Sequence, residues 1–185
     1  MSSVRLNKLY LIAGQRGTGK TTIAQKLAEA SGKKVIVVDT DAHPAYDSYE
    51  SIPADVAGIA SFVGSKGRIL ATDVDMVLML LNKYQSNAFI LLEDAKKYID
   101  RNLSRATKAF IIDMRKRNFD VAIMFHSLSD IPPYLCKNYN TLIIFKVDDN
   151  LDVPQRKFNQ WELIKKIATD VRKHPEWNYA KPVIK

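Results

Sequence analysis

The sequence has little of what secreted or membrane-spanning proteins contain. Its 185 residues include one cysteine, Cys136, which excludes an internal disulfide and favours a reducing compartment. No apolar run approaches the roughly 20 residues that a membrane-spanning helix requires, and the first residues lack a signal-peptide pattern. We therefore expect a cytoplasmic protein with no transmembrane segment.

Other absences narrow the class further. The three histidines, His43, His126 and His174, are far apart and give no metal-ligand spacing, so a zinc site is not expected. The chain has no internal repeat, no low-complexity segment and no motif that reads nucleic-acid bases. With 46% hydrophobic and 26% charged residues, it has the composition of one globular domain.

Positive charge is concentrated in the second half of the chain. Residues 1–95 carry 10 Lys and Arg against 10 Asp and Glu, whereas residues 96–185 carry 18 against 10, so the whole excess of +8 follows residue 95. Such asymmetry favours a polyanionic partner, with a solvated basic surface as the alternative. Without a base-reading motif, nucleic acid would be bound through its phosphates, with little sequence preference and strong salt dependence.

Apolar runs and helical periodicities alternate along the chain, which predicts an α/β fold with a mostly parallel sheet covered on both faces. We expect residues 1–150 to form the core and residues 151–185 to form a helical tail of the same domain. Residues 42–67 are expected to be a long loop with short pieces of structure. The predicted strands lie in KLYLIA, KVIVVDT, RILAT, AFILLED, FDVAIMFHS and TLIIFKV, and the predicted helices cover 20–31, a segment after Asp73, 103–114 and 159–174.

The stretch GQRGTGKTT lies between a predicted strand and a predicted helix. It matches the P-loop pattern, in which glycines let several backbone N–H groups converge on one phosphate at a helix N-terminus. The lysine reaches the outer phosphates and the following threonine ligates Mg²⁺. We therefore expect bound ATP and Mg²⁺, with nucleotide contacts from Gly14, Gly17, Thr18, Gly19, Lys20, Thr21 and Thr22.

Two acids, Glu93 and Asp94, end the apolar strand AFILL. In a P-loop site, the first acid would hold Mg²⁺ together with Thr21, and the second would orient the attacking water. ATPases of this kind usually have Asp before Glu, and this chain has the reverse order. The alternative to a catalytic pair is a solvated strand end.

A further polar strand end is expected near these acids. In hydrolysing P-loop proteins, an additional strand lies between the P-loop strand and the acid strand, and its polar tip senses the γ-phosphate or the water. His126 follows the apolar run VAIMF and fits this position. A partly buried histidine bonded to the backbone is the alternative.

These residues together resemble the HerA/FtsK group of P-loop ATPases, which includes viral genome-packaging, conjugation and filamentous-phage assembly ATPases. The resemblance lies in GQRGTGKTT, FILLEDAKKYI, MRKRNFDVAIMFHSLSDIPPYL and NTLIIFKV, and covers residues 8–147 without 42–67. The chain departs from the group in its reversed acids and in Phe125-His126, where Thr-Gln is usual. The resemblance implies a three-layer P-loop NTPase sandwich of about five or more strands, with the additional strand between the P-loop and acid strands.

The resemblance also implies a homo-oligomeric ring, often a hexamer, DNA translocation and an arginine that reaches the neighbouring subunit's site. Arg115 and Arg117 best match that arginine. Arg101, Arg105, Lys108 and Arg115 are spaced to share one face of the predicted helix. Docking on a capsid or a membrane complex, and a virion-associated location if the protein is viral, are further expectations.

The sequence thus predicts an ATP-hydrolysing, DNA-translocating motor, most similar to a viral or mobile-element packaging ATPase. One alternative is a small-molecule or nucleoside kinase, which the second acid and the polar strand tip disfavour. Another is a non-translocating ATP switch of an assembly or secretion machine, which sequence cannot separate from the motor.

Overall fold

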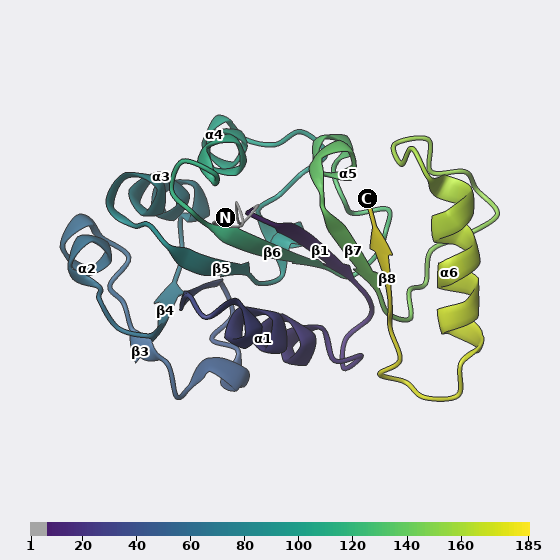
Figure 1. Ribbon diagram of the computed structural model, residues 1–185, viewed down its shortest axis with the longest axis horizontal. Coiled ribbons are helices and arrows are strands. Elements are labelled where there is room, and N and C mark those ends of the chain that lie inside the picture. Colours follow the sequence, from purple (N-terminus) through teal and green to yellow (C-terminus); the bar gives the residue numbers. More distant parts are fainter. Residues whose placement is uncertain (1–6) are drawn as a thin grey trace, which may run out of the picture.

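Eight strands form one sheet in the order β3-β4-β2-β5-β6-β1-β7-β8. The computed structural model describes residues 7–185, so the first six residues of the predicted core lie outside the described chain. Figure 1 shows the sheet running through the middle of the molecule, with helices on both sides. The strands are β1 Leu9–Ala13, β2 Lys34–Asp39, β3 Glu50–Ser51, β4 Lys66–Leu70, β5 Ala88–Leu92, β6 Asp120–Phe125, β7 Thr141–Ile144 and β8 Lys181–Ile184.

The first seven strands are parallel, as their apolar runs predict. Every residue of β5 and β6 is buried, because helices cover both faces of the sheet at these central strands. Strand β8 is the exception, since it pairs antiparallel with β7 at the sheet edge. The tail is therefore not only helical, and its final strand was not predicted.

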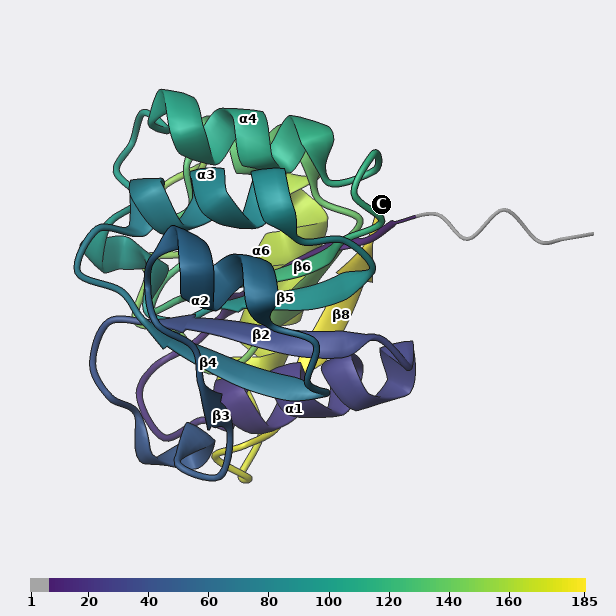
Figure 2. The same cartoon turned by 90° about the vertical axis from the view of Figure 1, so that its left-hand side faces the viewer.

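Helices cover the two faces unequally. Helix α1 (Lys20–Ser31) packs on one face, where it contributes Ala24 and Ala28 to a small core. The larger core lies on the other face, beneath five helices (Figures 1 and 2). These are α2 Val56–Ser61, α3 Val74–Tyr84, α4 Arg105–Asp113, α5 Pro133–Asn138 and α6 Trp161–Lys173; the short 3₁₀ helices are η1 Pro44–Tyr46 and η2 Ala95–Lys97.

Strand β6 lies between β1, which precedes the glycine-rich loop, and β5, which precedes the two acids. Leu9 of β1 aligns with Val121, and Phe89 of β5 aligns with Asp120. The carboxyl ends of the three strands therefore meet at one edge of the sheet. The expected additional strand between the P-loop and acid strands is confirmed.

The expected basic face of the helix at 103–114 is not formed as predicted. The Ser104 hydroxyl accepts a hydrogen bond from the Thr107 N–H at 3.0 Å and caps α4, which therefore begins at Arg105 and ends at Asp113. Arg101 precedes the helix and Arg115 follows it. Four basic side chains thus do not share one helical face.

A buried ion pair closes the opposite edge of the sheet. Lys33 Nζ lies 3.1 Å from Asp120 Oδ2, and both side chains are almost fully buried. The same ammonium donates to the Asn118 carbonyl at 2.8 Å. This pair joins the start of β2 to the start of β6.

Candidate nucleotide-binding site

The loop between β1 and α1 is tied to two neighbouring strand ends. The Gly14 N–H donates to the Phe125 carbonyl at 3.1 Å, and the Gln15 N–H donates to the Lys146 carbonyl at 2.9 Å. A Cβ on Gly14 would lie 2.5 Å from Phe145 Cβ, so a larger residue does not fit there. Gly17 and Gly19 have φ values of +74° and +96°, a region that favours glycine.

Helix α1 begins at Lys20, directly after this loop. The positive end of the helix therefore faces the loop, and within the described chain no side chain caps its first turn. Lys20 Nζ donates to the carbonyls of Gly14 and Gln15 at 2.7 and 2.8 Å. Burial lowers the pKa of Lys20, and the carboxylates of Glu93 and Asp94 partly oppose this shift.

Glu93 is buried beside the start of α1. One of its oxygens, Oε1, accepts a hydrogen bond from Thr21 Oγ1 at 3.0 Å and another from the Tyr46 hydroxyl at 2.5 Å. Tyr46 is fully buried, and burial together with the Glu93 charge raises its pKa far above the usual value. The tyrosine hydroxyl therefore stays protonated and donates to the carboxylate.

Asp94 points across to β6. Its Oδ1 lies 2.6 Å from His126 Nε2, and Lys97 Nζ lies 3.3 Å from its Oδ2. The backbone of Asp94 is left-handed, with φ +46° and ψ +47°, which is uncommon for a residue other than glycine. This turn sends Glu93 and Asp94 in different directions, one towards Thr21 and the other towards His126.

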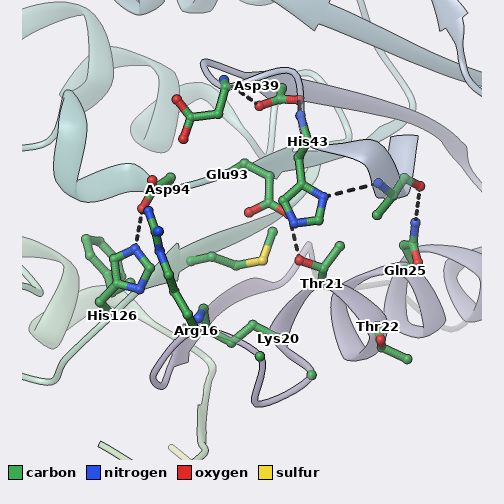
Figure 3. Close-up of a pocket in the computed structure, with 16 residues that line it drawn as sticks. Arg16, Lys20, Thr21, Thr22, Gln25, Asp39, His43, Glu93, Asp94 and His126 are labelled. Carbon is green, nitrogen blue, oxygen red and sulfur yellow. Dashed lines mark hydrogen bonds and ion pairs between the residues drawn. The ribbon is translucent and has the colours of Figure 1, made fainter. Parts of the chain in front are cut away.

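One cavity of about 520 Å³ is lined by Lys20, Thr21, Glu93, Asp94 and His126, among other residues. Figure 3 shows Lys20 and Thr21 on one side, with Glu93, Asp94 and His126 on the strand ends facing them. Arg16 extends from the loop towards Asp94 in the same view. Asp39, Asp41 and His43, which follow or end β2, complete the wall.

The structure brings most of the predicted site residues together. The cavity lining includes Gly17, Gly19, Lys20, Thr21, Thr22, Glu93, Asp94 and His126. Gly14 and Thr18 do not line the cavity, and the buried Thr18 hydroxyl donates to the Gln15 carbonyl at 2.8 Å.

Arg115 and Arg117 are not near this cavity. The Arg117 carbonyl accepts a hydrogen bond from Asn87 N, just before β5 begins, which places both arginines at the opposite edge of the sheet. They do not reach the site of their own chain. Their expected role towards a neighbouring subunit stays a prediction.

Sequence reasoning missed several residues of the site. Asp39 stands at the end of the apolar strand KVIVVD, just as Glu93 follows the apolar run FILL. This shared pattern could have identified Asp39 from the sequence. Asp39 accepts hydrogen bonds from the N–H groups of Asp41 and His43 and pairs with Arg68 at 2.8 Å. Tyr46 and Arg16 had no comparable signal.

The oxygen donors of Thr21 and Glu93 suit Mg²⁺, which commonly takes one or two protein oxygens and completes its shell with phosphate and water. Across residues 7–185 no group of three or more His, Cys, Asp or Glu side chains could hold a metal ion. In the same residues, no helix is both long and apolar enough to cross a membrane.

The strand order, glycine-rich loop, buried lysine and acid strand define a P-loop NTPase, a class that binds nucleoside triphosphates. A family model described as Zeta toxin matches residues 2–125, about two-thirds of the chain. The chain belongs to the Zeta toxin family, a kinase-like family of P-loop proteins. No curated protein sequence matches it.

Solved structures with a similar fold include a viral genome packaging NTPase and VirB4. The genome packaging NTPase B204 from Sulfolobus turreted icosahedral virus 2, with ATP-gammaS, has a TM-score of 0.74 and 12% identity over 96% of this chain and 92% of that chain. VirB4 of Thermoanaerobacter pseudethanolicus has a TM-score of 0.59 and 10% identity over 94% and 86%. The resemblance to this group is thus confirmed for the fold.

Proposed function

We propose that this protein hydrolyses ATP with Mg²⁺ and uses the energy to translocate DNA, as a genome-packaging-type motor. The observation that carries the proposal is the contact of 2.6 Å between Asp94 and His126, across two strand ends that face the phosphate loop. A second acid with a polar partner, next to a phosphate cradle, is an arrangement that favours water as the nucleophile.

Each residue has one task in this proposal. Lys20 and the N–H groups at the start of α1 bind the outer phosphates, and Thr21 and Glu93 would hold Mg²⁺, which supplies charge neutralisation when bound. Asp94 orients a water and accepts its proton. His126 fixes the Asp94 carboxylate and lies near where a terminal phosphate would be sensed.

A kinase is the second candidate, and the match to the kinase-like Zeta toxin family favours it. The match ends at Phe125, one residue before His126. Two features of the chain favour hydrolysis instead: β6 separates β1 from β5, and Asp94 adds a second acid beside Glu93. A DNA-independent ATP switch shares both features, so it must be separated from the motor by experiment.

A basic cavity next to the catalytic loops supports a polyanionic partner. It measures about 560 Å³ and lies between η2, the turn after β6 and the segment before α6, where it is lined by Lys96, Arg101, Arg156 and Lys157. Lys96 is paired with Asp130, and Lys157 donates to the Ser129 and Ile131 carbonyls. Arg101 and Arg156 have no ion-pair partner among residues 7–185, which leaves them for phosphates.

ATP turnover measured with and without double-stranded DNA tests the motor. We expect DNA to raise turnover and added salt to remove the increase, because phosphate contacts release counterions. Replacing both Arg101 and Arg156 with alanine should abolish the increase while basal turnover persists. The charge-matched control replaces Lys83 and Lys116, exposed lysines at the opposite sheet edge. ATP turnover that does not change when DNA is added would contradict the motor and favour the DNA-independent ATP switch.

The reaction products distinguish an ATP hydrolase from a kinase. Radiolabelled γ-phosphate from ATP should appear as inorganic phosphate, and its transfer to a nucleoside or metabolite with little hydrolysis would establish the kinase instead. Lys20→Ala should abolish turnover in either case, and unchanged turnover would refute the site. If the arginine acts between subunits, mixing inactive Arg115→Ala and inactive Asp94→Asn subunits should restore part of the activity.

A further inference from the structure

Arg16 lies in the phosphate loop, and its exposed side chain lines the phosphate cavity and extends towards Asp94 (Figure 3). Its charge reaches two sides of that cavity. The pKa of Asp41 is lowered mainly by the hydrogen bond from Lys97, and Arg16 adds to this shift. Burial lowers the pKa of Lys20, and Arg16 lowers it further. The guanidinium therefore acts on the loop lysine and on an acid of the facing wall.

No hydrogen bond or ion pair within residues 7–185 engages the Arg16 side chain. The acids that line the same cavity are each engaged by another side chain: Asp39 by Arg68, Asp41 by Lys97, Glu93 by Thr21 and Tyr46, and Asp94 by His126. The Lys20 ammonium donates to two carbonyls of the loop. Arg16 thus keeps all of its guanidinium N–H donors for a ligand in the cavity.

The backbone on both sides of Arg16 is fixed. The Gln15 N–H donates to the Lys146 carbonyl at 2.9 Å, and the Gln15 carbonyl accepts hydrogen bonds from Thr18 Oγ1 and Lys20 Nζ, each at 2.8 Å. Gly17 follows with φ +74°, so the chain turns directly after the arginine. The point from which Arg16 reaches into the cavity is therefore set by the loop, and a fixed donor needs little reorganisation when negative charge develops on a ligand.

We propose that Arg16 is a catalytic residue that acts in cis: its guanidinium donates to the γ-phosphate oxygens of ATP bound in its own chain as those oxygens gain charge. This inference rests on the proposed function, since it requires ATP hydrolysis at this site. In that reaction, water attacks the γ-phosphorus, the bond to the β–γ bridging oxygen breaks, and ADP leaves with the electron pair. Asp94 takes the proton of the water, and the guanidinium keeps its protons throughout.

The place of Arg16 in the chain favours action in cis. It lies on the same loop as Lys20, so the segment that binds the outer phosphates also carries the guanidinium. The planar fork of a guanidinium matches two phosphate oxygens at once, which a single ammonium does not. Arg115 and Arg117 lie at the opposite edge of the sheet and depend on a neighbouring subunit to meet a phosphate. Arg16 is present at the site of every copy.

Steady-state ATP hydrolysis and isothermal titration in MgCl₂ test the assignment on Arg16→Ala. We expect kcat to fall about 10²–10³-fold, while the Kd for ADP stays that of the unmodified protein. ADP with aluminium fluoride, which mimics the phosphoryl group in the transition state, should bind about 10²-fold more weakly. Arg16→Lys keeps the charge without the fork and should recover only part of the rate. Lys26→Ala is the matched control, since Lys26 is an exposed cation of α1 outside the cavity lining, and should hydrolyse ATP at the original rate.

The outcomes separate this inference from the proposed function. An unchanged kcat in Arg16→Ala would overturn the inference and leave the ATPase proposal standing. Loss of ADP binding in the same variant would also overturn it, because the arginine would then shape the loop or bind phosphate in the ground state. An unmodified protein that does not hydrolyse ATP would refute the proposed function, and the inference with it.

Mixing of subunits separates action in cis from action in trans. If Arg16 acts within its own chain, every site in a mixture of Arg16→Ala and Asp94→Asn lacks one of the two groups, and the mixture stays inactive. Activity restored by mixing would assign Arg16 to a neighbouring subunit and overturn the assignment. Two affinity tags, purified in sequence, show that the assemblies contain both variants. In a protein that does not assemble, the loss of rate in Arg16→Ala is itself an effect in cis.

Discussion

Replacing Tyr46 by phenylalanine removes one hydroxyl from the candidate magnesium site and leaves the aromatic ring in place. That hydroxyl donates to Glu93 Oε1 at 2.5 Å from a fully buried position. Glu93 is one methylene longer than the aspartate usual at this position, and the tyrosine holds its carboxylate beside Thr21. We therefore treat Tyr46 as a positioning residue, which does not itself line the cavity.

The expected magnitude follows from the charge on the acceptor. A hydrogen bond to a charged group contributes about 1.5–3 kcal/mol to the free energy of unfolding, and the isosteric ring adds little cavity cost. For a chain of this length, a loss of about 2 kcal/mol lowers Tm by about 4–8 °C. We also expect a lower kcat and a higher half-saturating Mg²⁺ concentration, with KM for ATP little changed.

Urea unfolding and steady-state ATP hydrolysis as a function of Mg²⁺ measure these effects. Tyr49→Phe is the matched control, because its ring lies edge-on to Tyr46 at 5.3 Å and its hydroxyl makes no hydrogen bond within the described residues. A Tyr46→Phe protein as stable as the original would refute the energetic reasoning. Reduced stability with an unchanged Mg²⁺ requirement would confine Tyr46 to a structural role.

Three further predictions concern the catalytic pair, the sheet edge and the thiol. His126→Ala should lower hydrolysis by about 10²-fold with ATP binding retained, and unchanged turnover would remove His126 from the mechanism. Lys33→Met should lower the free energy of unfolding by about 3–5 kcal/mol, because Asp120 stays buried without its lysine; equal urea midpoints would contradict this. Burial raises the pKa of Cys136 to about 12, so at pH 8 iodoacetamide should label the unfolded protein and spare the folded one. Rapid labelling of the native thiol would show that it is exposed.

The sequence was sufficient to predict which residues lie together in the parts of the candidate site that are contiguous or lie at strand ends. The loop from Gly14 to Thr21 is local, and its glycines, lysine and threonine have fixed roles once a strand precedes and a helix follows. Glu93, Asp94 and His126 were predictable because parallel strands present their carboxyl ends at one edge.

Strand β8 was not predictable from its sequence. Pro182 lacks an N–H and argues against a central strand, yet it is tolerated here because β8 is the edge strand and pairs only with β7. Helix α4 also begins later than predicted, at Arg105, because the Ser104 side chain caps it there although the apolar spacing begins at Leu103.

By itself, the sequence determined a P-loop and the buried strands that follow it. Both signals are local: hydrophobic periodicity, and residues such as Gly19 that adopt a particular backbone conformation, depend only on a few neighbouring residues. Only the tertiary structure decided what surrounds Glu93. Tyr46 lies 47 residues before it along the chain, within a stretch whose pattern predicted a long loop with short pieces of structure. The same holds for Trp177 and Asn178, which lie near the phosphate loop because the last strand folds back on β7, a long-range contact that no local pattern encodes.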